Sequence, residues 1–113
     1  MFDQWPITDP PLWKVEDPPK RVLVEIGLAM PTHPATFGAN SVPLRVRAGG
    51  LNRARTVPGL LYAWLRCTDG GWLAYVEFTA ETANGRGQLE VRQWCSARAV
   101  RPWTDESGPA RGG

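Results

Sequence analysis

Hydrophobic and polar residues alternate along much of this chain, and the alternation predicts strands rather than helices. Residues 21–28 (RVLVEIGL) place four apolar side chains on one face: Val22, Val24, Ile26 and Leu28. Residues 42–48 (VPLRVRA) alternate in the same way, and Pro43 favours an edge strand or the start of a strand there. Because successive side chains of a strand point to opposite faces, both segments are expected to be half-buried β-strands.

The strongest local signal is Asp69-Gly70, a dipeptide that favours a tight turn between two strands. Three strand-like runs surround and follow it: residues 60–67 (LLYAWLRC), 72–79 (WLAYVEFT) and 88–95 (QLEVRQWC). Residues 60–95 are therefore expected to form a three-stranded antiparallel meander. Residues 97–103 are expected to add a short terminal strand.

Symmetric pairing of the first two runs about the turn produces one wholly apolar face. The predicted pairs are Cys67 with Trp72, Leu65 with Ala74, Ala63 with Val76, and Leu61 with Phe78. The third run adds Leu89, Val91 and Cys95 to this face, with Gln93 as a polar exception. An apolar face of this kind predicts the core side of the sheet.

The opposite face of the meander is rich in aromatic and arginine side chains. Six of them form a candidate binding face: Tyr62, Trp64, Arg66, Tyr75, Arg92 and Trp94. Glu77 and Glu90 lie on the same face and are expected to form cross-strand ion pairs with its arginines. Exposed aromatic clusters are either covered by another part of the chain or used for binding. Three further tryptophans are available as cover: Trp5, Trp13 and Trp103.

Composition divides the chain into three parts. Residues 1–20 contain five prolines and two tryptophans, which predicts an extended arm with polyproline II tendency. Residues 21–103 carry the strand-like runs, with loops at residues 29–41 and 49–59, and form the expected folded domain. Residues 104–113 (TDESGPARGG) are polar and are expected to be a disordered tail.

The order strand, long loop, strand, tight hairpin, strand, short turn and terminal strand resembles an SH3-like small β-barrel over residues 21–103. The stretch GLLYAWLRCTDGGWLAYVEF is similar to the central hairpin of such barrels, and WCSARAVRP to the turn and last strand that close them. The resemblance implies a mainly β, antiparallel SH3-like barrel with an extended Pro/Trp-rich N-terminal arm. The first loop lacks the acidic run with which peptide-binding members engage basic ligands, so recognition of proline motifs is not expected. Such barrels bind peptides, DNA, RNA and other proteins.

Composition also narrows the class of protein. The chain has 113 residues, of which 42% are hydrophobic and 21% charged, as in a single globular domain. No apolar run approaches the length of a membrane span, and the first residues lack the features of a signal peptide, so we expect a cytoplasmic protein. Arginine outnumbers lysine by 11 to 2, which indicates a genome rich in G and C and favours a bacterial source.

The two cysteines, Cys67 and Cys95, are expected to be free. They lie on the first and third strands of the predicted meander, with backbones roughly 9–10 Å apart. This separation exceeds the disulfide reach of about 7 Å. Two cysteines are also too few to staple a small secreted domain, which agrees with a reducing compartment.

No catalytic, metal-binding or cofactor motif is present in the sequence. The one histidine, His33, follows Thr32 in a loop, and nothing pairs it with a nucleophile. Two cysteines and one histidine at scattered positions do not make a metal site, and the Gly-Gly pairs match no phosphate-binding fingerprint. We therefore expect a protein that is not an enzyme, with no cofactor, no metal and no small-molecule substrate.

Four arginines cluster in the sequence: Arg45, Arg47, Arg53 and Arg55. Arginine makes bidentate contacts with phosphate and stacks on bases, so this cluster predicts a second candidate surface, for nucleic acid. The cluster is equally typical of a solvated edge that blocks strand addition. The net charge of +2 is modest for a nucleic-acid-binding protein.

Two functions follow from these features. The first is a non-catalytic adaptor that binds another protein through the aromatic and arginine face, because aromatic residues and arginine are enriched at interface hot spots. The alternative is an accessory protein that binds DNA or RNA through the arginine cluster and stacking aromatics. The sequence leaves the partner and the oligomeric state open.

Overall fold

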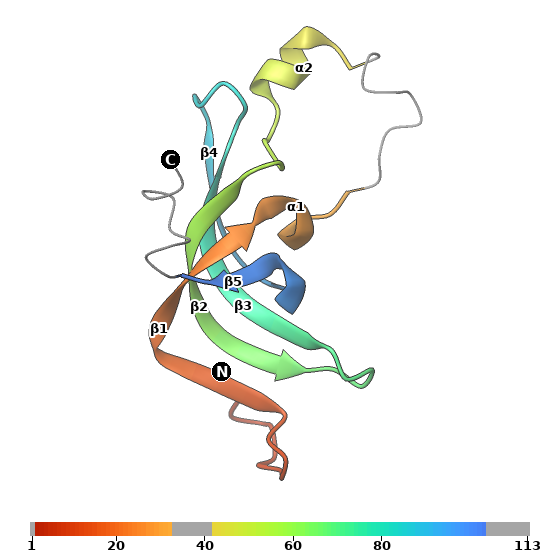
Figure 1. The fold of residues 1–113 in the computed structure, drawn as a ribbon, viewed down its shortest axis with the longest axis vertical. Helices are drawn as coiled ribbons and strands as arrows, with labels where there is room; N and C mark the ends of the chain where they lie inside the picture. The colour runs from red at the N-terminus through yellow and green to blue at the C-terminus, as the bar shows by residue number, and fades with distance from the viewer. Residues whose placement is uncertain (1, 33–41, 104–113) are drawn as a thin grey trace.

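The computed structural model describes residues 2–32 and 42–103, which form a five-stranded antiparallel sheet (Figure 1). The elements in chain order are β1 (Trp13–Glu25), α1 (Ile26–Ala29), α2 (Leu44–Gly49), β2 (Thr56–Arg66), β3 (Trp72–Glu81), β4 (Gln88–Ser96), the 3-10 helix η2 (Ala97–Ala99) and β5 (Val100–Pro102). The strands lie in the order β4-β3-β2-β1-β5. The predicted mainly β, antiparallel fold is confirmed, including the meander and the short terminal strand.

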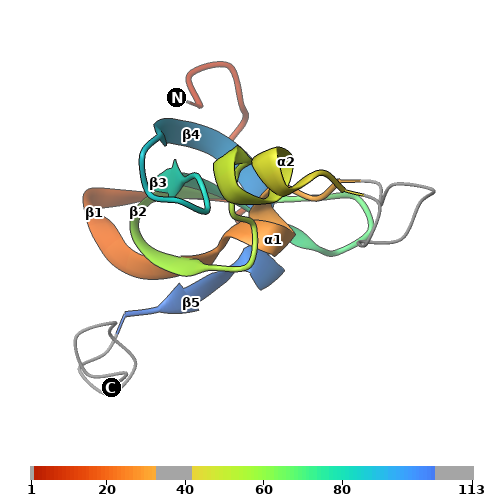
Figure 2. The same ribbon diagram turned by 90° about the horizontal axis from the view of Figure 1, so that it is seen from above.

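The sheet curls but does not close into a barrel (Figure 2). Strands β4 and β5 are its two edges, and they do not pair with each other. Helix α1 contacts both η2 and β4, so short helical segments fill the space between the two edges. No helix in residues 2–32 and 42–103 has the length and apolarity needed to cross a membrane.

The hydrophobic core lies between the concave side of the sheet and these short helices. Its largest fully buried side chains are Ile26, Leu61, Val24 and Val76. Gln93, the polar exception in the predicted core face, donates from Nε2 to the carbonyl oxygen of Ala29 at 2.7 Å. The amide is therefore satisfied at the end of α1, as a polar group near a core requires.

Strand β1 begins earlier than the sequence pattern predicts. It starts at Trp13, so residues 13–20 belong to the sheet, although they were expected to lie in the extended arm. Its pairing with β2 is interrupted between Val15 and Lys20, and Pro18 and Pro19 lie in this gap. Proline has no backbone N–H to donate to a neighbouring strand, so it is tolerated where the pairing of two strands is interrupted. The segment that precedes the sheet is thus residues 2–12.

The strand predicted over residues 42–48 is wrong, because the segment forms α2. The Pro43 carbonyl accepts the N–H groups of Val46 and Arg47, each at 3.0 Å. The apolar side chains of this helix are exposed, Leu44 by 74%. The alternation of apolar and polar residues in this segment therefore does not mark a face that packs against the core. Backbone hydrogen bonds from Ala83 and Asn84 tie the end of α2 to the tip of the β3–β4 hairpin.

The predicted tail, His33 and residues 33–41 of the predicted loop lie outside the described residues.

The pairing of β2 with β3 ends one residue earlier on β2 than the sequence predicts, so Cys67 belongs to the turn and not to the strand. The Cys67 N–H donates to the Gly71 carbonyl at 2.8 Å, and the Gly70 N–H donates to the Cys67 carbonyl at 3.0 Å. Gly70 has a φ of 88°, which is typical of the glycine that follows a type I turn in longer hairpin loops. The last pair is therefore Arg66 with Trp72, and none of the four predicted pairs forms.

Tyr62 is the extra residue of a β-bulge in β2. The register against β3 shifts between Leu61, which lies opposite Val76, and Ala63, which lies opposite Tyr75. Leu61 keeps its predicted place in the core. Residues 63–66, in contrast, have exchanged faces relative to the prediction, because a slip of one residue turns every side chain to the other side of the sheet.

Replacement of Gly59 by alanine is expected to destabilise the fold, because the backbones of β2 and β3 pass close together there. A Cβ at this position would lie 2.7 Å from the Glu77 carbonyl oxygen and 2.9 Å from Val24 Cγ2. We expect Gly59→Ala to lower the free energy of unfolding by about 1–3 kcal/mol in urea denaturation. Gly49→Ala is the control, since a Cβ there meets no atom within 4 Å. Equal stability of the two variants would contradict this packing.

Candidate functional site

Four of the six predicted aromatic-face residues lie together on the side of the sheet away from the core: Tyr62, Tyr75, Arg92 and Trp94. We call these four the outer aromatic face. The ring centroids of Tyr75 and Trp94 are 5.0 Å apart, and those of Tyr62 and Tyr75 are 6.2 Å apart. Both separations are in the range of favourable aromatic contacts.

Arg92 is fixed at one end of this face by two partners. Its Nη2 lies 2.9 Å from Glu77 Oε2 and donates to the Tyr62 hydroxyl at 2.8 Å. The guanidinium also lies 4.5 Å from the ring centroid of Tyr62. The hydrogen bond with Tyr62 and, to a lesser extent, the Glu77 carboxylate raise the pKa of Arg92. The predicted ion pair between Glu77 and Arg92 is therefore present. The Arg92 guanidinium is thus bound within the protein's own surface.

The other end of the outer aromatic face is covered by Phe2. Its ring stacks on Trp13 at 4.8 Å and meets Trp94 edge-on at 6.1 Å, and only 8% of the residue is exposed. Trp5 packs edge-on against Phe2 at 5.9 Å. Cover by another part of the chain was one of the two roles expected for the aromatic face. Tryptophans were expected to form this cover, and Phe2 was not identified from the sequence. The signal available was Phe2 itself, a large apolar residue at the start of a segment that also carries Trp5 and Ile7. The part of this face at Trp94 is thus internal packing.

Trp64 and Arg66 do not belong to this face, and their assignment to it is wrong. Trp64 lies opposite Ala74, a fully buried core residue, and Arg66 lies opposite Trp72. Directly opposed residues of an antiparallel pair share a face, so both side chains point to the concave side. The cause is the early turn, which exchanged the faces of residues 63–66. The Arg66 guanidinium lies 5.3 Å from the ring centroid of Trp72.

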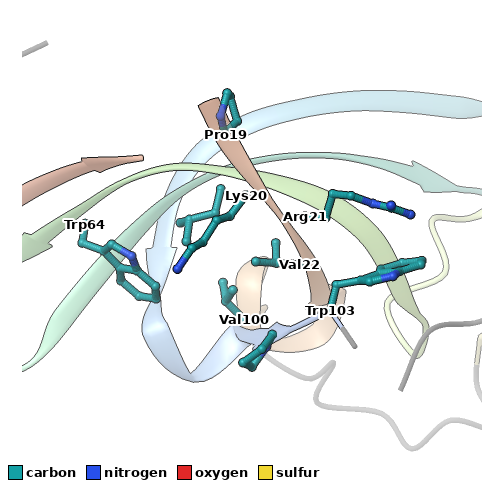
Figure 3. A pocket seen from close by; sticks show the side chains of 9 residues that line it. Pro19, Lys20, Arg21, Val22, Trp64, Val100 and Trp103 are labelled. Atoms are coloured by element: carbon teal, nitrogen blue, oxygen red, sulfur yellow. The ribbon is translucent and has the colours of Figure 1, made fainter. Parts of the chain in front are cut away.

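A cavity of about 570 Å³ opens beside Trp64 on the concave side (Figure 3). Trp64 and Trp103 stand at opposite sides of it, and the Lys20 side chain extends between them. Its other lining residues are Pro19, Arg21, Val22, Leu61, Val100 and Pro102. Trp64 and Val100 also pack against the core, so the walls are anchored to the fold. We call this cavity the trough; the sequence pointed to Trp64 but not to its neighbours.

A smaller cavity of about 320 Å³ lies on the other side of Trp64. It is lined by Lys14, Trp64, Trp72 and Ala97. Because Trp64 borders both cavities, it forms a ridge between them. The concave side therefore offers two apolar recesses in succession, on either side of one indole ring.

Basic side chains line both recesses. Lys20 and Arg21 line the trough, and Lys14 lines the smaller cavity. Arg21 lies 4.8 Å from the ring centroid of Trp103, in a cation–π contact that holds this wall of the trough. No carboxylate is among the lining residues of either cavity in the described part of the chain. Apolar walls with cationic edges favour a ligand that is both apolar and acidic.

The structure does not bring the four clustered arginines together as one free surface. Arg53 donates from Nε to the Met30 carbonyl at 2.8 Å and from Nη2 to the Gly27 carbonyl at 3.1 Å, so it caps α1. Arg55 lies 3.3 Å from Glu81 in an ion pair. The remaining two, Arg45 and Arg47, are exposed on α2. Two of the four guanidinium groups are thus engaged within the fold.

Metal-ligating side chains form no cluster in the described segments. Residues 2–32 and 42–103 contain no group of three or more His, Cys, Asp or Glu side chains that could hold a metal. Both cysteines are free, as predicted. Burial of Cys95 raises the pKa of its thiol to about 11, so this group is protonated near neutral pH and is a poor nucleophile.

Comparisons with known proteins identify no relative of this chain. No protein-family model, no curated protein and no solved structure matches it.

Replacement of Phe2 by alanine is expected to release the N-terminal segment from Trp13 and Trp94. Truncation of a buried phenylalanine costs about 3–5 kcal/mol in a core, but this segment can detach without unfolding the sheet. We therefore expect Phe2→Ala to lower the free energy of unfolding by about 1–2 kcal/mol and to shift tryptophan fluorescence to longer wavelength. Ile7→Ala is the control, since Ile7 is 91% exposed in the same segment. Unchanged fluorescence in Phe2→Ala would show that Phe2 is not the cover.

Proposed function

We propose that the protein is a non-catalytic module that binds another protein, and that the trough between Trp64 and Trp103 is the binding site. The observation that carries the proposal is an apolar recess walled by two tryptophans and edged by Lys20 and Arg21. The outer aromatic face supports this role less well, because Phe2 packs on Trp94 and Glu77 engages Arg92.

The composition of the trough favours a protein ligand over a substrate. Tryptophan and arginine are the residue types most enriched at interface hot spots, where they line desolvated pockets. The lining residues include no serine, histidine, cysteine or carboxylate that could act as nucleophile or general base. A binding role without catalysis is the simplest function for such a site.

Binding of nucleic acid is the less favoured function. Its main sequence support was the arginine cluster, and Arg53 and Arg55 are engaged by Met30, Gly27 and Glu81. The basic edge of the trough is compatible with a polyanion, so the experiment below includes a nucleic-acid probe.

We also propose that the fold is an open relative of the SH3-like small barrels. The β2–β4 meander and the placement of β5 beside β1 support this assignment, which would require a bridge between β4 and β5 to become a closed barrel. The two free cysteines support a reducing compartment, such as a bacterial cytoplasm.

Selection from a library of random peptides displayed on phage tests the proposed binding site. We expect the purified protein to enrich a family of peptides, and Trp103→Ala to weaken their binding about thirtyfold or more, because truncated hot-spot residues cost about 2 kcal/mol or more. Trp103 follows the last strand and is outside the core cluster, so this variant should fold. Trp5→Ala removes an indole that is 44% exposed on the N-terminal segment, and it should bind as the unmodified protein does.

Three results would contradict the proposal. They are the absence of any enriched peptide, equal binding by Trp103→Ala, and tighter binding of oligothymidylate than of every peptide. Circular dichroism of each variant separates loss of binding from loss of fold.

A further inference from the structure

The charged groups around Trp64 are not evenly distributed. Lys14, Lys20 and Arg21 line the two recesses, and Arg66 lies over the neighbouring Trp72. These four cations surround walls that are otherwise apolar. A partner that fills the recesses must therefore place negative charge next to apolar groups, or it would bury cations without compensation.

Glu16 forms ion pairs with two of these cations. Its carboxylate oxygens lie 3.3 Å from Lys14 Nζ and 3.9 Å from Lys20 Nζ. The side chain of Glu16 is only 9% exposed, whereas those of the two lysines are 65% and 63% exposed. Glu16 therefore lies beneath the lysines and orients them, while their outward N–H groups remain available to a ligand. The local charge stays positive after this pairing.

The ridge formed by Trp64 sets the shape of the ligand. The trough on one side has about 570 Å³, and the recess on the other side has about 320 Å³. A compact apolar group fills only one of them. An extended chain that crosses the indole can place one apolar side chain in each recess, because alternate side chains of an extended segment lie on the same side.

We infer that the trough and the adjoining recess bind an extended acidic segment of a partner protein, with two apolar side chains seated on either side of Trp64 and carboxylates at Lys14, Lys20 and Arg21. This inference rests on the proposed function and specifies the partner's chemistry. The cations of the site favour an acidic segment by charge complementarity, and its two recesses favour a segment with two apolar side chains.

Single-stranded nucleic acid fits this surface less well. Such ligands stack successive bases on exposed aromatic platforms along a basic groove. Here Trp64 packs partly against the core, and the recesses are walled by aliphatic and proline side chains such as Val22, Val100 and Pro102. These walls match the branched aliphatic side chains of a polypeptide.

The test uses a short synthetic peptide in which aspartate, leucine, phenylalanine and aspartate occupy alternate positions, so that an extended chain places all four side chains on one face. Its binding is measured by fluorescence anisotropy. Three comparison probes are the same peptide with asparagine in place of aspartate, the peptide with one apolar anchor replaced by serine, and oligothymidylate. We expect the first two replacements to weaken binding about tenfold each. Binding of the acidic peptide should also fall between roughly 0.05 and 0.5 M salt, as screening of surface charges requires.

A matched pair of variants locates the acidic contact. Lys20→Gln removes one cation from the trough and leaves Lys14 beside Glu16, and we expect it to weaken binding of the acidic peptide about fivefold. Arg45→Gln removes the same charge from exposed α2, and it should leave the affinity unchanged.

Different results overturn the inference at different levels. If library-selected peptides depend on Trp103 but bind equally with asparagine in place of aspartate, the inference fails and the proposed function stands. If one anchor suffices for full affinity, the two-recess arrangement is wrong. If no peptide binds and oligothymidylate does, the inference and the proposed function fail together.

Discussion

The turn at residues 67–71 determines which side of the sheet carries Trp64. The Gly70 backbone at positive φ closes the hairpin with Arg66 opposite Trp72, and this register turns Trp64 toward the concave side. The bulge at Tyr62 then restores Leu61 to the core, so the exchange of faces is confined to residues 63–66. A strand with regular pairing could not place Leu61 and Trp64 on the same side. The bulge thus allows one strand to supply both a core residue and the indole that borders both recesses.

This arrangement makes the two sides of the sheet unequal. On the side away from the core, aromatic rings continue from Tyr62 through Tyr75 and Trp94 to Phe2, and the N-terminal segment covers the far end. On the concave side, the early start of β1 brings Lys14 and Lys20 beside the tryptophans of β2 and β3. Because β1 continues on both sides of the interruption at Pro18 and Pro19, it places Lys14 and Lys20 on the concave side. Half-buried tryptophans and the lysines of β1 therefore meet on the concave side.

The sequence was sufficient for the parts of the fold that depend on local alternation. The meander, the short last strand, the free cysteines and most core positions of β3 and β4 follow directly from period-two patterns and spacing. Leu89 is the exception, because it was placed in the core face and is 49% exposed. The helix at α2 was missed because alternation of Leu44 and Val46 has meaning only if a sheet edge receives them, and both are exposed. The candidate aromatic face was predicted only in part, since Tyr62, Tyr75, Arg92 and Trp94 lie together while Trp64 and Arg66 lie on the concave side. A single glycine conformation and one bulge decided that parity, and neither leaves a signal in hydrophobic periodicity.

The central claim is that Trp64 and Trp103 face a partner while Trp13 and Trp94 pack against the protein's own N-terminal segment. Two-dimensional NMR of the indole N–H groups, during titration with the acidic two-anchor peptide, tests it most directly. The account predicts that the resonances of Trp64 and Trp103 shift and that those of Trp13 and Trp94 stay in place. Shifts at Trp94 and Trp13 with an unperturbed Trp64 would place the partner on the outer aromatic face and contradict it.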